Sequence, residues 1–264
     1  MGAEVPSRAE SSVRAELPPS SESSVRAELP PRAELIKCYR VADRSVPWVR
    51  VNFIASLDGA ATVDGLSGGL NNADDKLVFD TLRLLTDVIL VGAGTVRAEG
   101  YGGILLSEDD AAWRVQAGLA AQPPVAIVSG RLDLEPGHPV FVDAATRPIV
   151  LTHAAAPADR RAALAAVADV VICGDEAIDP RRLVAELAAR GLPQILCEGG
   201  PHLFGDLLAA DRVDELCLSL APVLVGGSAG RIAVGEAAAT RAMELLHVLR
   251  AGDMLFLRYL RPAG

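Results

Sequence analysis

The chain has 264 residues, a length that fits one large domain or two small ones. Half of the residues are hydrophobic, only 4% are aromatic, and the formal net charge is −9. The aliphatic content is enough for a sizeable core, and the acidic balance argues against a nucleic-acid or anionic-membrane partner. No apolar run reaches about 18 residues, so the sequence predicts no membrane span.

The N-terminal region differs in character from the rest. Residues 11–19, SSVRAELPP, recur at 23–31, and RAEL appears once more at 32–35. Segments rich in Ser, Pro, Glu and Arg bury little surface, so we predict a flexible tail over 1–33 and a single folded domain over 34–264. A docking or tethering arm is the alternative for the tail. The region has no apolar signal core, and the four cysteines, which are far apart and form no CxxC pattern, are typical of buried thiols in a cytoplasmic protein.

Beyond the tail, short apolar runs alternate with helical patterns. We expect strands at 49–54, 87–91, 125–128, 148–152, 170–173 and 194–197, and helices from Asp74, after Gly103, from Pro157, from Pro180 and from Pro201. Continuous apolar strands between helices favour a parallel sheet that is covered on both faces. The runs at 215–220, 245–249 and 254–259 have little helix between them, and Ala251-Gly252-Asp253 predicts a hairpin. The fold class is therefore α/β, with a mixed, mostly parallel sheet.

The stretch Glu198–Gly205 joins the strand at 194–197 to the following helix. Gly199 and Gly200 would let the backbone pass close to a ligand, and Pro201 suits a first helical turn. The free N–H groups and the positive dipole end of such a helix form an anion site. An ordinary strand–turn–helix with Gly-Gly as punctuation explains the stretch equally well.

Three glycine-bearing junctions, at 92–94, 130 and 199–200, follow predicted strands. Together they favour a groove for an extended phosphate-bearing molecule such as a dinucleotide. The GxGxxG fingerprint is absent, so a standard Rossmann dehydrogenase is disfavoured. The four histidines form no HExxH, HxH or HxE pair, which leaves a metal site unsupported, and neither a GxSxG elbow nor a P-loop is present.

Single polar residues leave alternatives open. Thr95 could bind a phosphate or cap a helix, and His202 is better explained as a solvated helix-end residue than as a general base. Arg83 could hold a phosphate, lie on the surface, or pair with Asp80 three residues earlier. Asp58 is either a polar ligand contact or a turn former. Taken alone, these residues indicate an anionic, nucleotide-sized ligand.

Several motifs occur together in a specific order. They are Ser56-Leu57-Asp58-Gly59, Leu82-Arg83, Gly92-x-Gly94-Thr95-Val96, Ser129, Glu198-Gly199-Gly200-Pro201, Val213-Asp214-Glu215 and the segment 221–227. The series resembles the reductase domain of the riboflavin-biosynthesis deaminase/reductase family over about residues 45–260. The resemblance implies a dihydrofolate-reductase-like fold, NADPH as cofactor and a homodimer. It also implies reduction of the ribose of 5-amino-6-ribosylamino-pyrimidinedione 5′-phosphate to a ribityl chain. The zinc signatures of the deaminase domain are missing, so the chain resembles a reductase standing alone.

The same resemblance implies roles for individual residues. The expected cofactor-binding positions are Ile54, Ala55, Gly92, Gly94, Thr95, Val96, Ser129, Gly199, Gly200, Pro201, His202, Leu203, Phe204 and Gly205. The expected substrate-binding positions are Ser67, Arg83 and Glu99. Asp58 and Glu198 are the candidates for relaying a proton to the reduced carbon, while the nicotinamide would supply the hydride.

The chain also departs from the family pattern on the substrate side. Ala60 stands where many members have Lys or Arg, the segment 67–70 lacks the usual tryptophan, and Glu99-Gly100-Tyr101 replaces an acidic-Asp-Pro sequence. Two alternatives follow. One is a reductase of the same fold that acts on dihydrofolate or another pterin-like ring, whose amidine-like edge an acidic residue would hold. The other is a non-catalytic nucleotide-binding protein.

Overall fold

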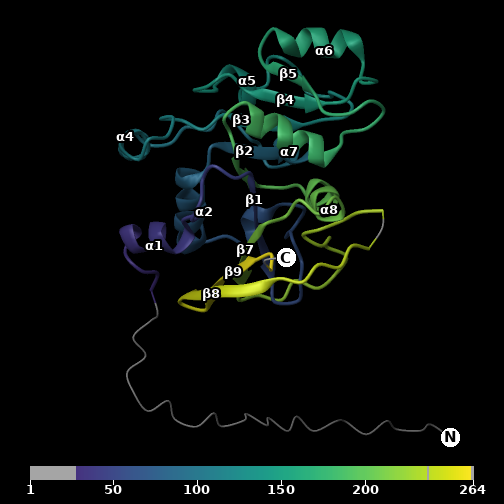
Figure 1. Cartoon of the computed structure of the whole chain (residues 1–264). Helices are drawn as coiled ribbons and strands as arrows, with labels where there is room; N and C mark the ends of the chain where they lie inside the picture. The colour runs from purple at the N-terminus through teal and green to yellow at the C-terminus, as the bar shows by residue number, and fades with distance from the viewer. Residues whose placement is uncertain (1–27, 237, 263–264) are drawn as a thin grey trace, which may run out of the picture.

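The computed structural model describes residues 28–236 and 238–262, and Figure 1 shows them built around one nine-stranded sheet. The strands are β1 (Trp48–Ser56), β2 (Val88–Gly92), β3 (Val125–Val128), β4 (Ile149–Thr152), β5 (Asp169–Ile172), β6 (Gln194–Cys197), β7 (Glu215–Ala221), β8 (Glu244–Ala251) and β9 (Met254–Leu260). Their order in the sheet is β5-β4-β3-β2-β6-β1-β7-β9-β8. Strands β1 to β7 pair in parallel, whereas β9 is antiparallel to both β7 and β8. The predicted mixed sheet with a C-terminal hairpin is confirmed.

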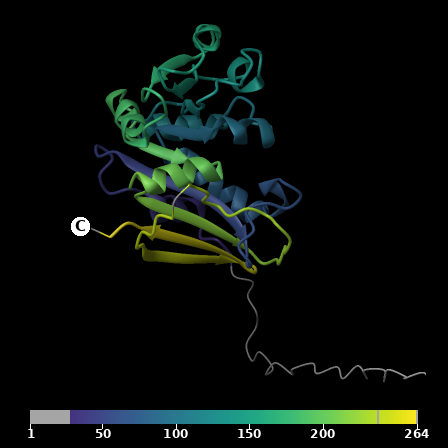
Figure 2. The same cartoon turned by 90° about the vertical axis from the view of Figure 1, so that its right-hand side faces the viewer.

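Helices cover both faces of the sheet. They are α1 (Arg32–Tyr39), α2 (Ala73–Leu85), α3 (Ala93–Ala98), α4 (Glu108–Gln116), α5 (Pro139–Val142), α6 (Ala158–Ala165), α7 (Pro180–Ala189) and α8 (Pro201–Ala209). Alternate residues of β2 show the two faces, because Val88 and Leu90 pack with α7 and α8 while Ile89 and Val91 pack with α3, α5 and α6. Helices α1 and α2 cover the C-terminal strands. Figure 2 shows the sheet from the side, from teal β4 to yellow β8.

Helix α2 illustrates how the local sequence sets an element. The Asn72 side chain caps it by accepting from the backbone N–H of Asp75 at 2.9 Å, so the helix begins slightly before the predicted Asp74. Val78, Leu82 and Leu85 are buried as their helical spacing predicts. The helix therefore packs against the sheet through its apolar face and keeps its N-terminal turn near the carboxyl end of β1.

Three helices were not predicted, and one changes the expected domain boundary. Helix α1 begins at Arg32, inside the predicted tail, because Leu35, Ile36 and Tyr39 are buried in the core. The upstream copies of RAEL are followed by two prolines and lack counterparts of Ile36 and Tyr39. The remainder of the predicted tail, 1–27, lies outside the described residues. The short helices α3 and α5 lacked enough apolar periodicity to be recognised.

A buried ionic cluster sits where β1, β7 and β9 meet. Arg50 and Arg258 both bond the carboxylate of Glu215, each through a closest contact of 2.7 Å. Burial raises the pKa of Glu215, but the charges and hydrogen bonds of the two arginines outweigh it and lower the pKa to about 2. Asp214 accepts from the N–H of Val49 at 2.8 Å. The Val213-Asp214-Glu215 motif therefore has a structural role.

Two further expectations concern a membrane-spanning helix and the burial of the cysteine thiols. No helix in the described part of the chain is both long and apolar enough to cross a bilayer. Cys173, Cys197 and Cys217 are buried free thiols, as the sequence predicts, whereas Cys38 is partly exposed.

Candidate active site

Two adjoining cavities lie at the carboxyl ends of the strands. The larger, which we call the strand-end groove, has a volume of about 1000 Å³ and follows the ends of β2, β3 and β4 and the start of α8. The smaller, which we call the inner pocket, has a volume of about 540 Å³ and lies between β1, α2 and the loop after α3. Four residues line both cavities: Thr62, Thr95, Glu99 and Pro201. The two cavities therefore adjoin.

The strand-end groove combines glycines and other small residues at the starts of α3 and α8 with charged side chains elsewhere: Arg97, Glu99, Arg131, Asp133, Glu176, Asp206 and Glu236. Of the predicted cofactor positions it brings together Gly92, Gly94, Thr95, Ser129, Gly200, Pro201, His202 and Leu203. A Cβ at Gly200 would lie 2.6 Å from the Thr95 hydroxyl oxygen, so this close approach requires glycine. The N-cap residues of α3 and α8, Gly92 and Gly200, provide no side-chain cap. Their first-turn N–H groups are thus available to an anion, as the sequence analysis expected.

Five predicted cofactor positions line neither cavity: Ala55, Val96, Gly199, Phe204 and Gly205. Val96 is fully buried, and Phe204 stacks on Phe53 with 5.3 Å between ring centroids. A Cβ at Gly205 would lie 2.0 Å from the carbonyl oxygen of Val234, so this glycine allows a loop to pack on α8. These positions support the walls of the groove from behind. Ile54, the remaining predicted position, lines the inner pocket.

A buried ion pair forms one wall of the inner pocket. The guanidinium of Arg83, on α2, bonds both carboxylate oxygens of Glu198 at 2.7 Å, and the Tyr101 hydroxyl donates to the same carboxylate at 2.6 Å. The Glu198 side chain is only 1% exposed. Burial and the charge of Glu198 raise the pKa of Tyr101, so its hydroxyl stays protonated.

This arrangement bears on two expectations. Arg83 was predicted to hold a phosphate, or else to pair with Asp80, but its forked guanidinium is occupied by Glu198 and lies 4.2 Å from the centre of the Phe79 ring. Asp80 pairs instead with Lys76. Glu198 was predicted to relay a proton, and in this structure it accepts from both Arg83 and Tyr101. The two residues form one wall of the pocket.

Asp58, predicted as a catalytic residue, lines neither cavity. Its carboxylate is exposed and accepts from the Ser56 hydroxyl and from the backbone N–H groups of Val225 and Gly226, at 3.1 and 2.7 Å. The hydrogen bond from Ser56, followed by those from Gly226 and Val225, lowers the pKa of Asp58 to about 2. Asp58 therefore ties the turn after β1 to the loop after β7.

The predicted substrate residues Ser67 and Glu99 do meet at the inner pocket. The backbone N–H of Ser67, which opens a short 3-10 helix at Ser67–Gly69, donates to Oε1 of Glu99 at 3.0 Å. Both residues line the pocket, and Glu99 also faces the groove. This contact joins the 3-10 helix to the end of α3 at the pocket.

Asp75, on α2, is a candidate site residue that the sequence analysis did not single out. It lines the inner pocket and is 8% exposed. Burial raises its pKa even though Ser219 donates a hydrogen bond to the carboxylate. A perturbed carboxyl group in a cavity is typical of functional sites. The signal was present in the sequence, because Asp75 lies on the apolar stripe of Val78, Leu82 and Leu85.

A metal centre finds no support in this geometry. Within residues 28–236 and 238–262, no three His, Cys, Asp or Glu side chains gather as metal ligands do.

Comparisons with known proteins agree with the fold. The chain is 29% identical over 182 residues to a 2,5-diamino-6-ribosylamino-4(3H)-pyrimidinone 5′-phosphate reductase of Archaeoglobus fulgidus, covering 69% of this chain and 83% of that protein. A reductase of the same name from Methanothermobacter thermautotrophicus is 28% identical over 218 residues, covering 81% and 97%. The crystal structure of a pyrimidine reductase-like protein from Corynebacterium diphtheriae superposes with a TM-score of 0.75 at 26% identity, covering 83% and 93%.

The family itself is shown by a match that extends over most of the chain. Residues 47–257 match the model of the RibD C-terminal domain, a span that includes every strand from β1 to β8 and both cavities. The resemblance stated from the motifs is confirmed, and the chain belongs to the RibD C-terminal domain family.

Proposed function

We propose that the chain uses NADPH to reduce the ribosyl group of a 6-ribosylamino-pyrimidine 5′-phosphate to its ribityl form, a step of riboflavin biosynthesis. One observation supports this most directly. The strand-end groove and the inner pocket share Thr95, Glu99 and Pro201, so a dinucleotide in one and a ring in the other would meet at these residues. The named relatives, both reductases of this substrate class, agree with it.

The residues of the groove fit a nicotinamide dinucleotide. The uncapped first turns of α3 and α8 would hold the phosphates. Gly200 has no side chain, so the cofactor could approach the backbone beside Thr95. When bound, the cofactor supplies the hydride. Arg97 and Arg131 line the groove and share Asp133 as partner, at 2.7 and 3.4 Å. This trio carries one net positive charge and is the part of the groove that would suit the extra phosphate of NADPH, whereas Glu99, Glu176, Asp206 and Glu236 also line the groove. Comparing the KM values for NADPH and NADH tests this choice.

Within the ribosylpyrimidines, Asp75 favours a ring that keeps its 2-amino group. A buried carboxylate can accept from the amine and from the adjacent ring N–H of a 2-aminopyrimidinone, forming a paired contact. The pyrimidinedione has no such amine. The relatives' names specify the diamino compound. We therefore place 2,5-diamino-6-ribosylamino-pyrimidinone 5′-phosphate ahead of the deaminated substrate.

The second candidate function is the reduction of dihydrofolate or a similar pterin. Arg83 is the one cation among the described residues that line the inner pocket, and Glu198 already occupies it. The pocket thus offers no unengaged cation to a substrate phosphate. A pterin ring needs none there, and its amidine-like edge would suit Asp75 as well.

A single assay separates these functions. The purified chain is mixed with NADPH and, in turn, the diaminopyrimidinone ribotide, the pyrimidinedione ribotide and dihydrofolate, and the loss of NADPH absorbance is followed. We expect the highest kcat/KM for the diamino ribotide. Faster turnover of dihydrofolate would support the second candidate. No oxidation with any of the three would contradict both and leave the non-catalytic alternative.

We also propose a homodimer that forms through the edge strand β8. Leu245, Leu246 and Val248 on this strand are 52%, 52% and 45% exposed, an unusual concentration of apolar surface at a sheet edge. Light scattering should give twice the chain mass, and Leu246→Glu should lower it toward the monomer. A wild-type mass of one chain would contradict the proposal.

A further inference from the structure

The inner pocket carries a net negative charge. Three acidic side chains line it, Asp75, Glu99 and Glu198, whereas Arg83 is the one cation among its described lining residues. Nε and Nη2 of Arg83 each bond an oxygen of Glu198 at 2.7 Å, so this pair is neutral as a whole. The pocket thus keeps the charge of Glu99, and that of Asp75 as well whenever its carboxyl is ionised. A cavity of this sign repels an anion.

The two helix starts at the inner pocket are occupied as well. Asn71 and Asp75, on either side of the start of α2, both line the pocket. The side chain of Asn72 caps this helix by accepting from the N–H of Asp75 at 2.9 Å, and Asp75 itself places a carboxylate in the first turn. At the short 3-10 helix, the N–H of Ser67 donates to Glu99 at 3.0 Å. Both helix starts therefore hold the chain's own oxygens instead of an anion from outside.

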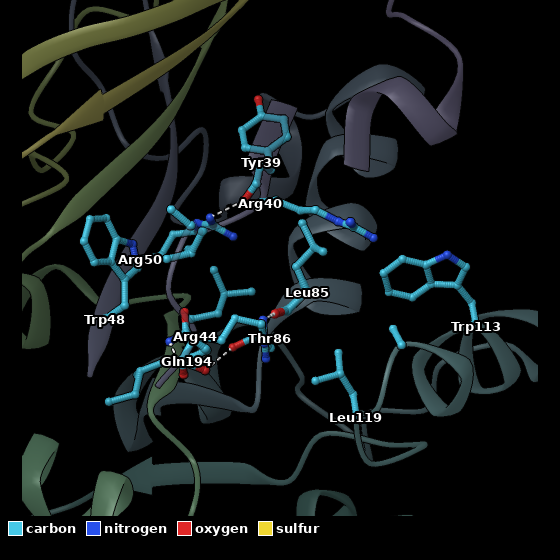
Figure 3. A pocket seen from close by; sticks show the side chains of 15 residues that line it. Tyr39, Arg40, Arg44, Trp48, Arg50, Leu85, Thr86, Trp113, Leu119 and Gln194 are labelled. Atoms are coloured by element: carbon cyan, nitrogen blue, oxygen red, sulfur yellow. Dashed lines mark hydrogen bonds between the residues drawn. The ribbon is translucent and has the colours of Figure 1, made fainter. Parts of the chain in front are cut away.

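Arginines gather at the opposite end of the sheet. A third cavity, of about 400 Å³, lies at the amino ends of β1 and β6, and Figure 3 shows Arg40, Arg44 and Arg50 around it. Acidic residues are missing from its described lining, and it shares no lining residue with the inner pocket. Arg44 pairs with Asp87 and Arg50 with Glu215, so two of the three arginines belong to ion pairs of the fold. These cations therefore do not offset the charge of the inner pocket.

We propose that the inner pocket does not recognise a 5′-phosphate, so that the chain reduces the dephosphorylated 6-ribosylamino-pyrimidine as readily as the phosphorylated one. The inference rests on the function proposed above and alters one feature of its substrate. A phosphate monoester carries about 1.5 to 2 negative charges at pH 7, whereas the nucleoside ends in a neutral hydroxyl. Such a hydroxyl can donate to Glu99, because a carboxylate that accepts one N–H has further acceptor sites.

The redox step is the same for both substrates. The imine of the opened sugar gains a hydride at C1′ and a proton at its nitrogen, its carbon–nitrogen double bond becomes single, and NADPH is oxidised to NADP⁺. The phosphate takes no part in this exchange. A phosphomonoester hydrolysis upstream of the reduction would supply the nucleoside.

The test compares two substrates that differ only in the phosphate. The full chain, with saturating NADPH, receives either the diaminopyrimidinone ribotide or the nucleoside made from it by a phosphatase that is then removed. A pocket that bound the phosphate through a cation would favour the ribotide by about tenfold or more, whereas we expect a preference below about fivefold. A larger preference for the ribotide would overturn the inference and leave the proposed function intact. Oxidation of NADPH with neither compound would overturn both.

A cation added at the rim of the pocket should create the missing preference. Leu105 lines the inner pocket and is 73% exposed, so an arginine there could reach a phosphate without being buried. Leu105→Arg should raise the ratio of kcat/KM for the ribotide to that for the nucleoside by about tenfold.

Val115→Arg is the matched control for this variant. Val115 is 59% exposed on α4 and lines none of the three cavities, so its replacement adds the same charge elsewhere and should leave the ratio unchanged. An equal rise in Val115→Arg would assign the effect to overall charge. No rise in Leu105→Arg would mean that the lack of a free cation does not set the preference. Either result would overturn the inference.

Discussion

The strand-end groove and the inner pocket adjoin, yet they depend on different chemistry. Around the starts of α3 and α8 the groove is formed by glycines, by other small residues and by two uncapped helix starts. The inner pocket is formed by charged side chains, with Asp75, Glu99 and the Arg83–Glu198 pair around one cavity. The contrast teaches that added bulk at these helix starts should impair cofactor binding in the groove. Altered charge should impair substrate handling in the inner pocket. Four substitutions test that division.

The largest effect is expected at Gly200. Gly200→Val places side-chain atoms where a Cβ alone already lies 2.6 Å from the Thr95 oxygen, so it should weaken NADPH binding by about 100-fold or more. Fluorescence titration of NADPH measures this. Gly137→Val is the control, because a Cβ there meets nothing within 4 Å and the residue lines neither cavity. Normal NADPH affinity in Gly200→Val would refute the steric account of the groove.

Asp75→Asn should separate substrate handling from cofactor binding. We expect kcat/KM for the substrate to fall about 100-fold, while the Kd of NADPH changes little. Asp74→Asn, one residue earlier on α2 and outside the cavities, is the control. If both variants lose activity equally, the effect belongs to the helix and not to the pocket.

The same variant has a pH signature. Burial raises the pKa of Asp75 above its value in the unfolded chain, so the folded state retains the proton to higher pH. This residue therefore makes the free energy of unfolding decrease as the pH rises from the unfolded pKa through the folded one. Asp75→Asn removes that decrease and should be more stable than the wild type at neutral pH. Urea unfolding at pH 4 and pH 7 measures the difference, and a less stable variant at pH 7 would contradict the sign.

Breaking the ion pair should cost stability more than cofactor affinity. Glu198→Gln leaves the buried guanidinium of Arg83 without a countercharge, and the free energy of unfolding should fall by about 3 kcal/mol. Denaturant unfolding measures it. Replacing both partners, Arg83→Met with Glu198→Leu, should recover much of the loss. If the double variant is no better than the single one, the pair is not the source of the effect.

The smallest effect is expected at Asp58. Because this carboxylate lies outside both cavities and holds the loop at Val225 and Gly226, Asp58→Asn should change kcat by less than about twofold. Because the pKa of Asp58 is lower in the folded chain than in the unfolded chain, its carboxylate stabilises the fold at pH values above the unfolded pKa. This contribution is lost as the pH falls through about 2. A large loss of turnover at neutral pH would return Asp58 to the catalytic candidates.

The sequence predicted the architecture well because apolar runs and glycine junctions act locally. All nine strands lie within a residue or two of their predicted positions, and the groove contains Gly92, Thr95 and Gly200 as expected. Glycine motifs report a need for space near the backbone, which a single stretch of sequence can reveal. Helix α1 was missed because its first four residues repeat a pattern that the upstream segment also carries.

The inner pocket was predicted less well for a physical reason. The role of a carboxylate or a guanidinium depends on its partner, and Arg83 and Glu198 are 115 residues apart. Neither sequence neighbourhood shows that they bond each other. Asp58 lies in the stronger motif, yet its side chain is exposed. Asp75 lies in the weaker motif, yet its side chain is buried in the inner pocket.

Helix α2 carries both Asp75 and Arg83, and both side chains line the inner pocket. Eight residues of α-helix correspond to about 12 Å along the axis, so the distance between an acceptor and the ion pair is set by helical rise. A molecule that contacts both Asp75 and the Arg83–Glu198 pair must span about this distance, whatever its chemical class. Inserting one residue between them would turn Arg83 by about 100° and detach it from Glu198. The register of one helix thus limits which molecules this enzyme can accommodate.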